Sequence, residues 1–465
     1  MVVSCKRAAG IVMGLLLLMI PGTSVFAQTG TIYTLEALAD SARHHLPLLL
    51  QKQALINSAQ ANVRDARHAY LPKVNVVEEV SIGTDNDLAG GFLPVPGVIH
   101  GISGGITAAN NSQGATSNLA SLYGEYELVN FGLRGAQVNQ AKAYAGVQQA
   151  DFDKEYYLVK WQIGKVYFEI LKDRSLLAVN EENIRRYQTM YTVSVALTGN
   201  GVNAGVDSSL AKAGLSSSRV SYNQEEAALR KLEEQLAYLT GIAAPVIRMD
   251  TSDKKGVVTS GLLEKDGAGA NPLADYYFRQ ELHYRSQQDL VRKMYLPKII
   301  LGAGGWARGS SIQYNNDYKP LEEGLGYQRL NYVAGIGITY DLFNGIRRRD
   351  KLAVAGYQAD AAAYALKQQQ LVLQTESLQA DADIEAARKN LDELPVQLQA
   401  ATDAYNQKLA QYQAGIINLV DLTNAAFVLY QAQSDYVTTL NAWYVAGLNK
   451  AAVTGNLDPF IQTVK

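Results

Sequence analysis

The chain contains the same pattern twice, and this internal repeat is its strongest structural constraint. Tyr-Leu-Pro-Lys at 70–73 returns at 295–298, and Tyr-Glu-Leu-Val-Asn at 126–130 returns as Tyr-Asp-Leu-Phe-Asn at 340–344. From the second motif onward the two copies stay 214 positions apart (126 to 340, 241 to 455). Loops accumulate insertions, so constant spacing over this length indicates rigid elements of fixed length.

The N-terminal segment 1–27 has the features of a secretory signal. Basic residues at 6–7 precede the apolar run 14–20, and Val-Phe-Ala at 25–27 matches a small-residue cleavage site. The apolar run is too short for a retained membrane anchor. Cleavage would remove the single cysteine, Cys5, and two positive charges, which takes the formal net charge from −2 to −4. A mature chain without thiols suits an oxidising compartment.

Hydropathy and charge argue against a helical membrane protein and against a nucleic-acid-binding protein. No later segment has the ~18 uninterrupted apolar residues of a membrane helix, so a helical membrane span is not expected. The net charge is near zero, and the only basic tract is Arg347, Arg348 and Arg349. These features argue against nucleic acid as a partner.

Prolines bound the helices predicted before the strands. Residues 34–69 have helical character with an interruption at Pro47, and the matching stretch 271–294 is also predicted to be helical. Each stretch ends at a Leu-Pro pair, at Pro72 or Pro297, where proline does not allow a helix to continue.

Period-two alternation appears downstream of each Leu-Pro pair. Residues 119–129 and 332–342 alternate apolar side chains with small or polar ones, more cleanly in the second segment. Strands of ~10 residues with one apolar face fit the wall of a membrane barrel. Alternation alone is equally compatible with a soluble hairpin. The Gly/Asn/Ser-rich stretches 84–118 and 309–327 are predicted to be exposed loops.

Long helices follow the strands in both halves. Apolar residues recur every seven positions, which predicts coiled-coil seams with left-handed supercoiling. The series are Leu215, Tyr222, Leu229 and Leu236; Ile384, Leu391, Leu398 and Tyr405, with Ala387, Leu394 and Ala401 at the intermediate positions; and Leu422, Leu429, Tyr436 and Trp443. The proline-free stretch 133–198 would span about 100 Å as one helix, more than the depth of a globular core. Pro395 lies in the second-half counterpart, where we expect a kink or local break.

The predicted elements constrain one another. Four membrane-type strands do not close a barrel, and an open strand edge in lipid leaves backbone groups unpaired at several kcal/mol each. Single-chain barrels start at about eight strands, so closure needs several copies, most simply in a ring. With the long helices stacked about the same axis, the residues alone predict a membrane-anchored conduit.

The predicted mature chain resembles the TolC family of outer-membrane channels, the exit ducts of tripartite efflux pumps and type I secretion systems. The resemblance rests on the repeated plan, on Tyr-Leu-Pro before each first strand, and on the motifs Leu-Val-Asn-Phe-Gly (128–132) and Leu-Phe-Asn-Gly (342–345). The most specific element is the segment 412–422, Tyr-Gln-Ala-Gly-Ile-Ile-Asn-Leu-Val-Asp-Leu, which is similar to the family's helix-tip pattern.

The resemblance implies a mainly α-helical fold with membrane β-strands and an internal two-fold repeat. Long antiparallel coiled-coil helices form an α-barrel, and four strands per chain contribute to a trimeric twelve-stranded β-barrel. The implied divisions are a signal peptide (1–27), a first repeat (28–241), an inter-repeat equatorial segment (242–270), a second repeat (271–455) and a C-terminal tail (456–465).

The resemblance also implies a function and partners. The chain is expected to be a passive outer-membrane channel that extends into the periplasm and is gated at its periplasmic tip. The expected partners are two further copies of the chain in a homotrimer, outer-membrane lipid, a periplasmic adaptor (membrane fusion) protein, and an inner-membrane pump or ABC transporter. Cargo selection is expected to reside in the pump and adaptor.

By resemblance, Asp207 and Asp421 take the tip carboxylate positions of the two repeats, and Tyr412 takes the tip tyrosine. A ring of carboxylates at a constriction attracts cations and repels anions. Helix N-capping is an alternative role for both aspartates and is compatible with gating. The family's archetype has an arginine and a second aspartate where this chain has Ile417 and Asn424, so closure here is expected to rely on hydrogen bonds from Tyr412 and on apolar contact.

Two tip turns are expected to receive the adaptor. Gly201 with Val202 and Gly415 with Ile416 match the docking turns of the family, although glycine also commonly ends a helix.

The basic tract at 347–349 opens a predicted helix, where the helix dipole disfavours positive charge. Two roles stay open: an anchor to anionic headgroups or a lumen lining at the membrane interface, and a solvated helix face. The chain's five histidines show no metal-ligand spacing, and the sequence has no phosphate-binding loop or nucleophile elbow. We therefore predict no metal, no cofactor and no enzyme activity.

The alternative function is a periplasmic coiled-coil adaptor or scaffold without a pore. In that case the alternating strands would pack on a soluble core instead of lipid.

Overall fold

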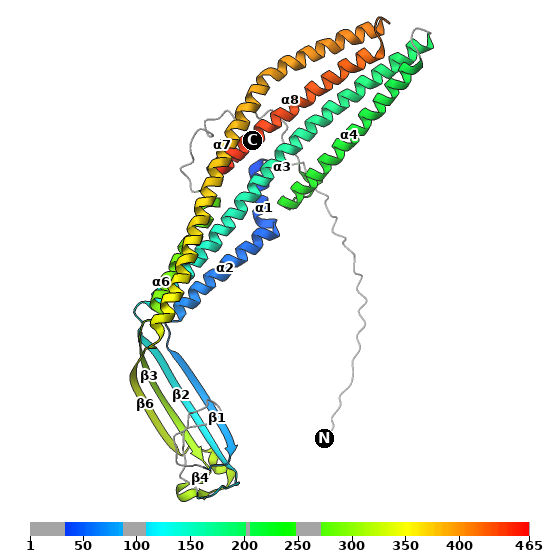
Figure 1. Cartoon of the computed structure of the whole chain (residues 1–465). Coiled ribbons are helices and arrows are strands. Elements are labelled where there is room, and N and C mark those ends of the chain that lie inside the picture. Colours follow the sequence, from blue (N-terminus) through cyan, green and yellow to red (C-terminus); the bar gives the residue numbers. More distant parts are fainter. Residues whose placement is uncertain (1–32, 87–107, 201–204, 248–270, 465) are drawn as a thin grey trace, which may run out of the picture.

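The computed structural model describes residues 33–86, 108–200, 205–247 and 271–464. The molecule is an elongated rod, with strands at one end and two long helical hairpins at the other (Figure 1). The predicted signal peptide, most of the loop 84–118, Gly201, Val202 and most of the segment 242–270 lie outside the described residues. The domain boundaries drawn from the sequence stay predictions.

Three short helices precede the strands: α1 (Leu35–His45), α2 (Pro47–His68) and α6 (Pro272–Met294). The side-chain oxygens of Thr34 and Asn271 cap α1 and α6. Pro47 lies at the start of α2, where its missing N–H leaves no helical bond unmade. The expected helices at 34–69, with the break at Pro47, and at 271–294 are confirmed.

Four antiparallel strands form one sheet in the order β1-β2-β3-β6. They are β1 (Lys73–Gly83), β2 (Ala115–Val129), β3 (Lys298–Ser310) and β6 (Arg329–Thr339). The central pair joins the two halves of the chain, since β2 belongs to the first repeat and β3 to the second. Among the described residues, β1 and β6 are the edges of this sheet. Both predicted strands exist, but β2 begins earlier and β6 ends earlier than the sequence indicated.

The two faces of this sheet differ in composition, because directly paired residues on neighbouring strands share a face. We define the apolar face as the one that carries Val74, Val76, Leu122, Leu301, Leu330 and Ile336. The polar face carries Asn75, Glu79, Ser121, Arg308, Arg329 and Asn331. Strands with an apolar outward face and a polar inward face are typical of outer-membrane channels.

The segment between β3 and β6 is largely exposed, as expected for 309–327, but it is folded and not a plain loop. It contains the short strands β4 (Ile312–Gln313) and β5 (Asp317–Tyr318) and the 3-10 helices η2 (Tyr314–Asn316) and η3 (Leu321–Leu325). Thr116 Oγ1 donates to the carbonyl of Leu321, and Asn118 Nδ2 donates to the carbonyl of Leu325 at 2.8 Å. These bonds attach η3 to the outer end of β2.

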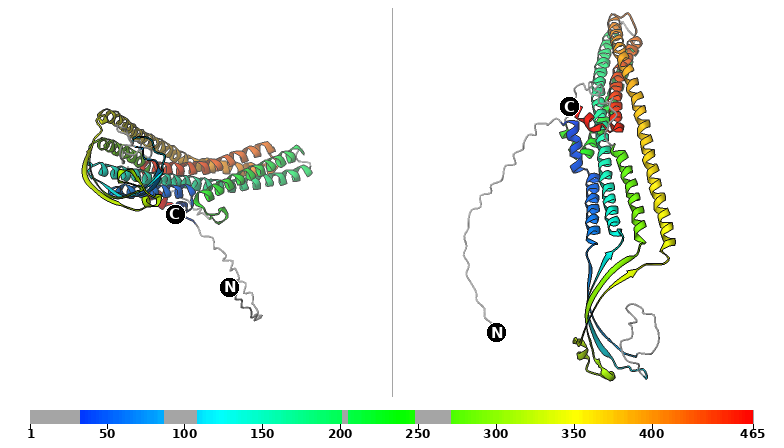
Figure 2. Two further views of the ribbon diagram at one scale, coloured as in Figure 1. Left: turned by 90° about the horizontal axis from the view of Figure 1, so that it is seen from below. Right: turned by 90° about the vertical axis from the view of Figure 1, so that its left-hand side faces the viewer.

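Two long helical hairpins form the rest of the rod (Figure 2). They are α3 (Leu133–Gly199) with α4 (Gly205–Thr240), and α7 (Asn344–Gln413) with α8 (Leu419–Thr454). With 67 residues, α3 is about 100 Å long, as expected. It packs along α4, α8, α2 and α6. Within the described ranges, no helix is long and apolar enough to cross a membrane.

The predicted seams lie inside the hairpins. Buried heptad positions include Leu215, Leu229 and Leu236 in α4, Ala387, Leu394 and Ala401 in α7, and Leu422, Leu429 and Trp443 in α8. We expected a kink or a local break at Pro395. The helix α7 is continuous through this residue, so there is no break, and α7 is bent rather than straight (Figure 1). Pro395 is exposed, so water can satisfy the carbonyl that its missing N–H leaves free.

Among the described residues, apolar side chains form two buried clusters. The larger one lies where α1, α2, α3 and α8 meet the 3-10 helix η1 (Ala244–Val246) and the C-terminal helix α9 (Leu457–Thr463), and it includes Phe168 stacked on Tyr444 at 5.3 Å between ring centroids. We define the tip cluster as the second group: Met190, Ala211, Ala401, Tyr405, Tyr412, Leu419, Leu422, Ala426, Leu429 and Ala432.

Candidate channel tip

The turn between α7 and α8 is a glycine-terminated helix end. Gly415 has φ +70, a left-handed conformation that favours glycine. Its N–H donates to the Tyr412 carbonyl at 3.0 Å, and the Ile416 N–H donates to the Gln411 carbonyl at 2.9 Å. Together these two backbone hydrogen bonds close the C-terminus of α7 with a fixed geometry. It leaves Ile416 72% exposed at the tip.

The start of α8 is capped by Asn418, a residue that the sequence analysis missed. Asn418 Oδ1 accepts the Asp421 N–H at 2.9 Å. Asp421 is therefore not the N-cap of α8, which corrects the capping alternative for this residue. Asp421 lies exposed in the first turn, where a carboxylate interacts favourably with the helix dipole. The pattern Asn-x-x-Asp before an apolar run could have revealed this cap.

Tyr412 is fully buried in the tip cluster, beside Leu419 at the start of α8. Within one chain it therefore stabilises the hairpin turn and does not line an open surface. Its gating role stays a prediction.

In the other hairpin, Asp207 lies half-buried in the first turn of α4. This placement matches that of Asp421, since both carboxylates follow the tip turn of their own hairpin. The two expected docking residues at 201–202 lie outside the described residues. The conformation of an expected docking turn can therefore be described only for the α7–α8 turn.

The three arginines at 347–349 lie in the first turns of α7, immediately after the sheet. Arg347 and Arg349 are exposed and Arg348 is half-buried. Arg349 Nε lies 3.4 Å from Asp350 Oδ1, an exposed pair that contributes little. The tract is thus at the junction expected of it, and its anchoring role stays a prediction.

A polar contact between the two hairpins was not predicted. Arg186 of α3 is buried and donates to Gln433 Oε1 of α8 at 2.7 Å, and Tyr430 donates to Asn180 Oδ1 at 3.2 Å. Burial lowers the pKa of Arg186. The spacing of Asn180, Asn183 and Arg186 along one face of α3 was the available sequence feature.

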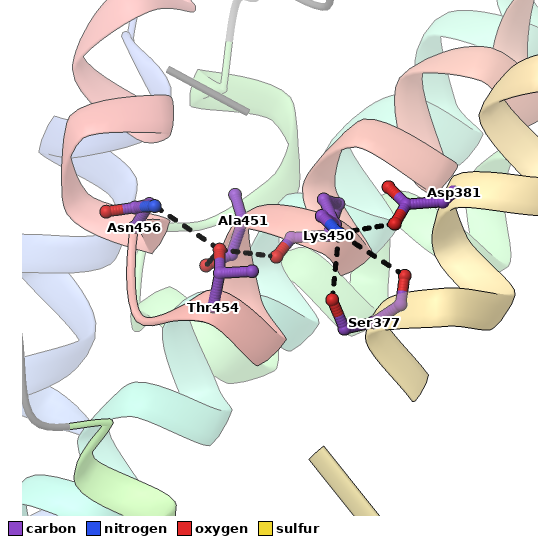
Figure 3. Close-up of polar contacts among 6 residues, drawn as sticks. All are labelled: Ser377, Asp381, Lys450, Ala451, Thr454 and Asn456. Atoms are coloured by element: carbon purple, nitrogen blue, oxygen red, sulfur yellow. Dashed lines mark hydrogen bonds and ion pairs between the residues drawn. The ribbon is translucent and has the colours of Figure 1, made fainter. Parts of the chain in front are cut away.

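A second contact that was not predicted connects α8 to α7 (Figure 3). Lys450 is buried, and its Nζ donates to Asp381 Oδ2 at 2.7 Å and to Ser377 Oγ at 2.8 Å. A further buried lysine, Lys160 of α3, pairs with Asp458 of α9. Such pairs satisfy ammonium groups that the close helix packing removes from water.

Comparison with known proteins identifies the fold. The sequence pattern of the family described as "Outer membrane efflux protein" matches residues 38–242 and 280–456. A comparison with curated sequences finds no match. Similar structures include the outer-membrane channel OprN (18% identity, TM-score 0.71, covering 91% of this chain and 90% of that one). They also include VceC of Vibrio cholerae (16%, 0.72, 90% and 96%) and the CmeC channel of Campylobacter jejuni (13%, 0.70, 93% and 90%).

These findings confirm the TolC-like fold and the location in the outer membrane, extending into the periplasm. Nothing in them favours the pore-less adaptor. The family is one of transport conduits. The matched residues cover most of both repeats, and the chain belongs to the outer membrane efflux protein family.

Proposed function

We propose that three copies of this chain close a single barrel and form the outer-membrane exit duct of a tripartite efflux pump or type I secretion system. The observation that carries the proposal is the four-stranded sheet with an apolar face and with β1 and β6 at its edges. Unpaired edges are not tolerated in lipid, so β6 of one copy pairs with β1 of the next. Three sheets supply twelve strands, above the minimum for a barrel.

The trimer is tested by cysteine crosslinking. The only cysteine of the chain lies in the predicted signal peptide, so a mature chain gives no background. One cysteine is placed in β1 and one in β6, and the pair of positions is varied to find the register. Oxidation should then produce a covalent trimer. The protein should also conduct ions in planar bilayers. A monomer found in the periplasmic fluid, without crosslinks, contradicts the proposal.

The proposed partners are a periplasmic adaptor and an inner-membrane pump or ABC transporter, and the duct itself carries out no catalysis. The exposed Ile416 and the fixed turn at Gly415 support docking at the α7–α8 tip, with Gly201 and Val202 as the corresponding turn. Ile416→Asp should abolish copurification of the adaptor after crosslinking while leaving the trimer intact. Unchanged copurification would place docking elsewhere.

We also propose that Asp207 and Asp421 form the selective constriction, with Tyr412 holding the turn that presents Asp421. Both carboxylates follow a tip turn, which supports this role. Asp207→Asn and Asp421→Asn should each reduce cation preference and block by multivalent cations in single-channel recordings. Unchanged selectivity in the double variant would reject the gate.

A further inference from the structure

We propose that the polar face of the sheet carries a binding station for amphipathic organic anions, formed by Arg308, Arg329 and the aromatic hollow beside them. The proposal rests on the proposed function, in which this face lines the channel. It adds a chemical class of solute to a part of the channel wall far from the tip. The two arginines are close to the outer end of the sheet, where β3 ends and β6 begins.

The orientation of the sheet places these residues inside the duct. Cross-strand partners Arg308 and Arg329 share a face with the pair Trp306 and Asn331, two positions along the strands. The face that carries valine, leucine and isoleucine fits lipid, and the face that carries arginine, asparagine and glutamate fits water, so the polar face is the inward one.

A hollow of about 290 Å³ opens on this face. Tyr123, Trp306, Leu119 and Val333 provide apolar walls, and Arg308 also lines the hollow. The hollow exists because Tyr123 packs over glycine: a Cβ at Gly304 would lie 3.1 Å from its Cδ2. Its volume is near the lower end of small-molecule sites, enough for a fused pair of aromatic rings.

The arginine pair determines the charge of the ligand. Arg308 and Arg329 are directly opposite each other on β3 and β6, an arrangement of like charges that destabilises a sheet. In the part of the chain that the structure describes, neither guanidinium forms an ion pair, and Arg329 donates to the carbonyl of Gln328 at 3.1 Å. A carboxylate or sulfonate held between them would relieve the repulsion with charge-assisted bonds.

One carboxylate shares this row of the polar face. Glu79 of β1 is two strands away from Arg308, with Leu119 between them, which corresponds to about 10 Å. At this distance the Glu79 carboxylate reduces the local positive charge but is too far away to bind the two guanidinium groups directly. An apolar ring body therefore fits against Tyr123, Trp306 and Leu119, and its anionic group reaches the arginines.

The experiment measures binding of naphthalene-2-sulfonate to the full-length purified protein by calorimetric titration, which does not depend on an open tip. Arg308→Gln and Arg329→Gln should each weaken binding roughly tenfold, because each removes a charge-assisted bond. Arg308→Lys should retain part of the affinity, and Trp306→Leu should weaken it several-fold. The neutral analogue 2-naphthalenemethanol should bind weakly to all forms.

Lys319→Gln is the matched control. Lys319 pairs with Asp317 at 2.7 Å in the β4–β5 segment, outside the four-stranded sheet, so its loss removes one positive charge without touching the station. Equal affinity in Arg308→Gln, Arg329→Gln and wild type, with trimers intact, overturns the binding station but leaves the duct standing. A protein that gives neither trimers nor conductance overturns both proposals.

Discussion

Lys450 Nζ of α8 donates to Asp381 Oδ2 of α7 at 2.7 Å, and the lysine side chain is 11% exposed while the aspartate is 52% exposed. Because the ammonium group is the more deeply buried of the two, the stability cost of breaking the pair comes mainly from leaving this charge without its carboxylate. Asp381→Ala leaves a buried ammonium with Ser377 as its remaining partner, and should lower the free energy of unfolding by about 1–2 kcal/mol. Replacing both residues by apolar ones of similar volume should recover part of this loss, as thermal unfolding at fixed protein concentration can measure.

An exposed pair on the same helix provides the control. Lys389 Nζ lies 2.7 Å from Glu385 Oε1, and both side chains are more than half exposed. Glu385→Ala should not change the unfolding midpoint measurably. Equal losses for the two pairs would contradict the assignment of Lys450 as a buried, specifically satisfied charge.

The second prediction concerns a close approach of α3 and α8. A Cβ at Gly164 would lie 2.9 Å from both δ carbons of Leu448, which is fully buried. Gly164→Ala should destabilise the protein by about 1–3 kcal/mol, although alanine favours the helix. Gly146→Ala in the same helix, where a Cβ would have nothing within 4 Å among the described residues, should be stabilising by up to ~1 kcal/mol. The same sign of effect in both variants would count against the packing explanation.

The third prediction concerns pH. Burial raises the pKa of Asp173 on α3 and of Glu225 on α4, and the nearby charge of Asp173 raises the pKa of Glu225 further. Lys172, 3.2 Å from Asp173, opposes the shift of the aspartate. Both pKa values are raised in the folded state, so the protonated carboxyl groups contribute to the free energy of unfolding. This contribution is fully present below the ordinary pKa values of about 3.8 and 4.5 and is lost as the pH rises through the raised pKa values.

Glu225→Gln removes one member of this pair. We expect greater stability than wild type at neutral pH and a shallower decline of stability with rising pH, measured by denaturant unfolding from pH 4 to 7. Glu226→Gln is the control, since Glu226 is an exposed neighbour that pairs with Arg230 at 2.6 Å. A wild-type slope in Glu225→Gln would show that the carboxyl pair does not set the pH response.

The fourth prediction concerns the tip. Asn418→Ala removes the cap of α8 and should cost about 1 kcal/mol locally, whereas Asn418→Asp retains a capping oxygen. Hydrogen exchange at the Asp421 amide, which donates to Asn418, should quicken in the alanine variant and stay slow in the aspartate variant. Identical exchange rates of the Asp421 amide in both variants would show that the Asn418 side chain does not protect this amide.

Much of the fold could be predicted because local chemistry determines it. Pro47, Pro72 and Pro297 set helix limits that any tertiary environment would respect. Heptad spacing identified side chains that are in fact buried, such as Leu394 and Leu422.

The features that were missed depend on contacts between distant residues. The order of the 311–328 segment comes from bonds to Thr116 and Asn118, which lie about two hundred positions away in sequence. Pro395 predicted a kink or a local break, and α7, which packs along α8, has no break there. Of the tip, the turn at Gly415 was predictable from its residue type. The gate and docking roles require neighbouring copies or partners that one chain does not contain.

The pairing of β2 with β3 joins a strand of the first repeat to a strand of the second. In the proposed ring, the contact between neighbouring subunits would join β6 of a second repeat to β1 of a first repeat. The seam inside each subunit is thus a covalently tethered counterpart of the seam between subunits. With two repeats in one polypeptide, three of the six seams of the proposed ring lie within a chain, so only three have to form between separate chains.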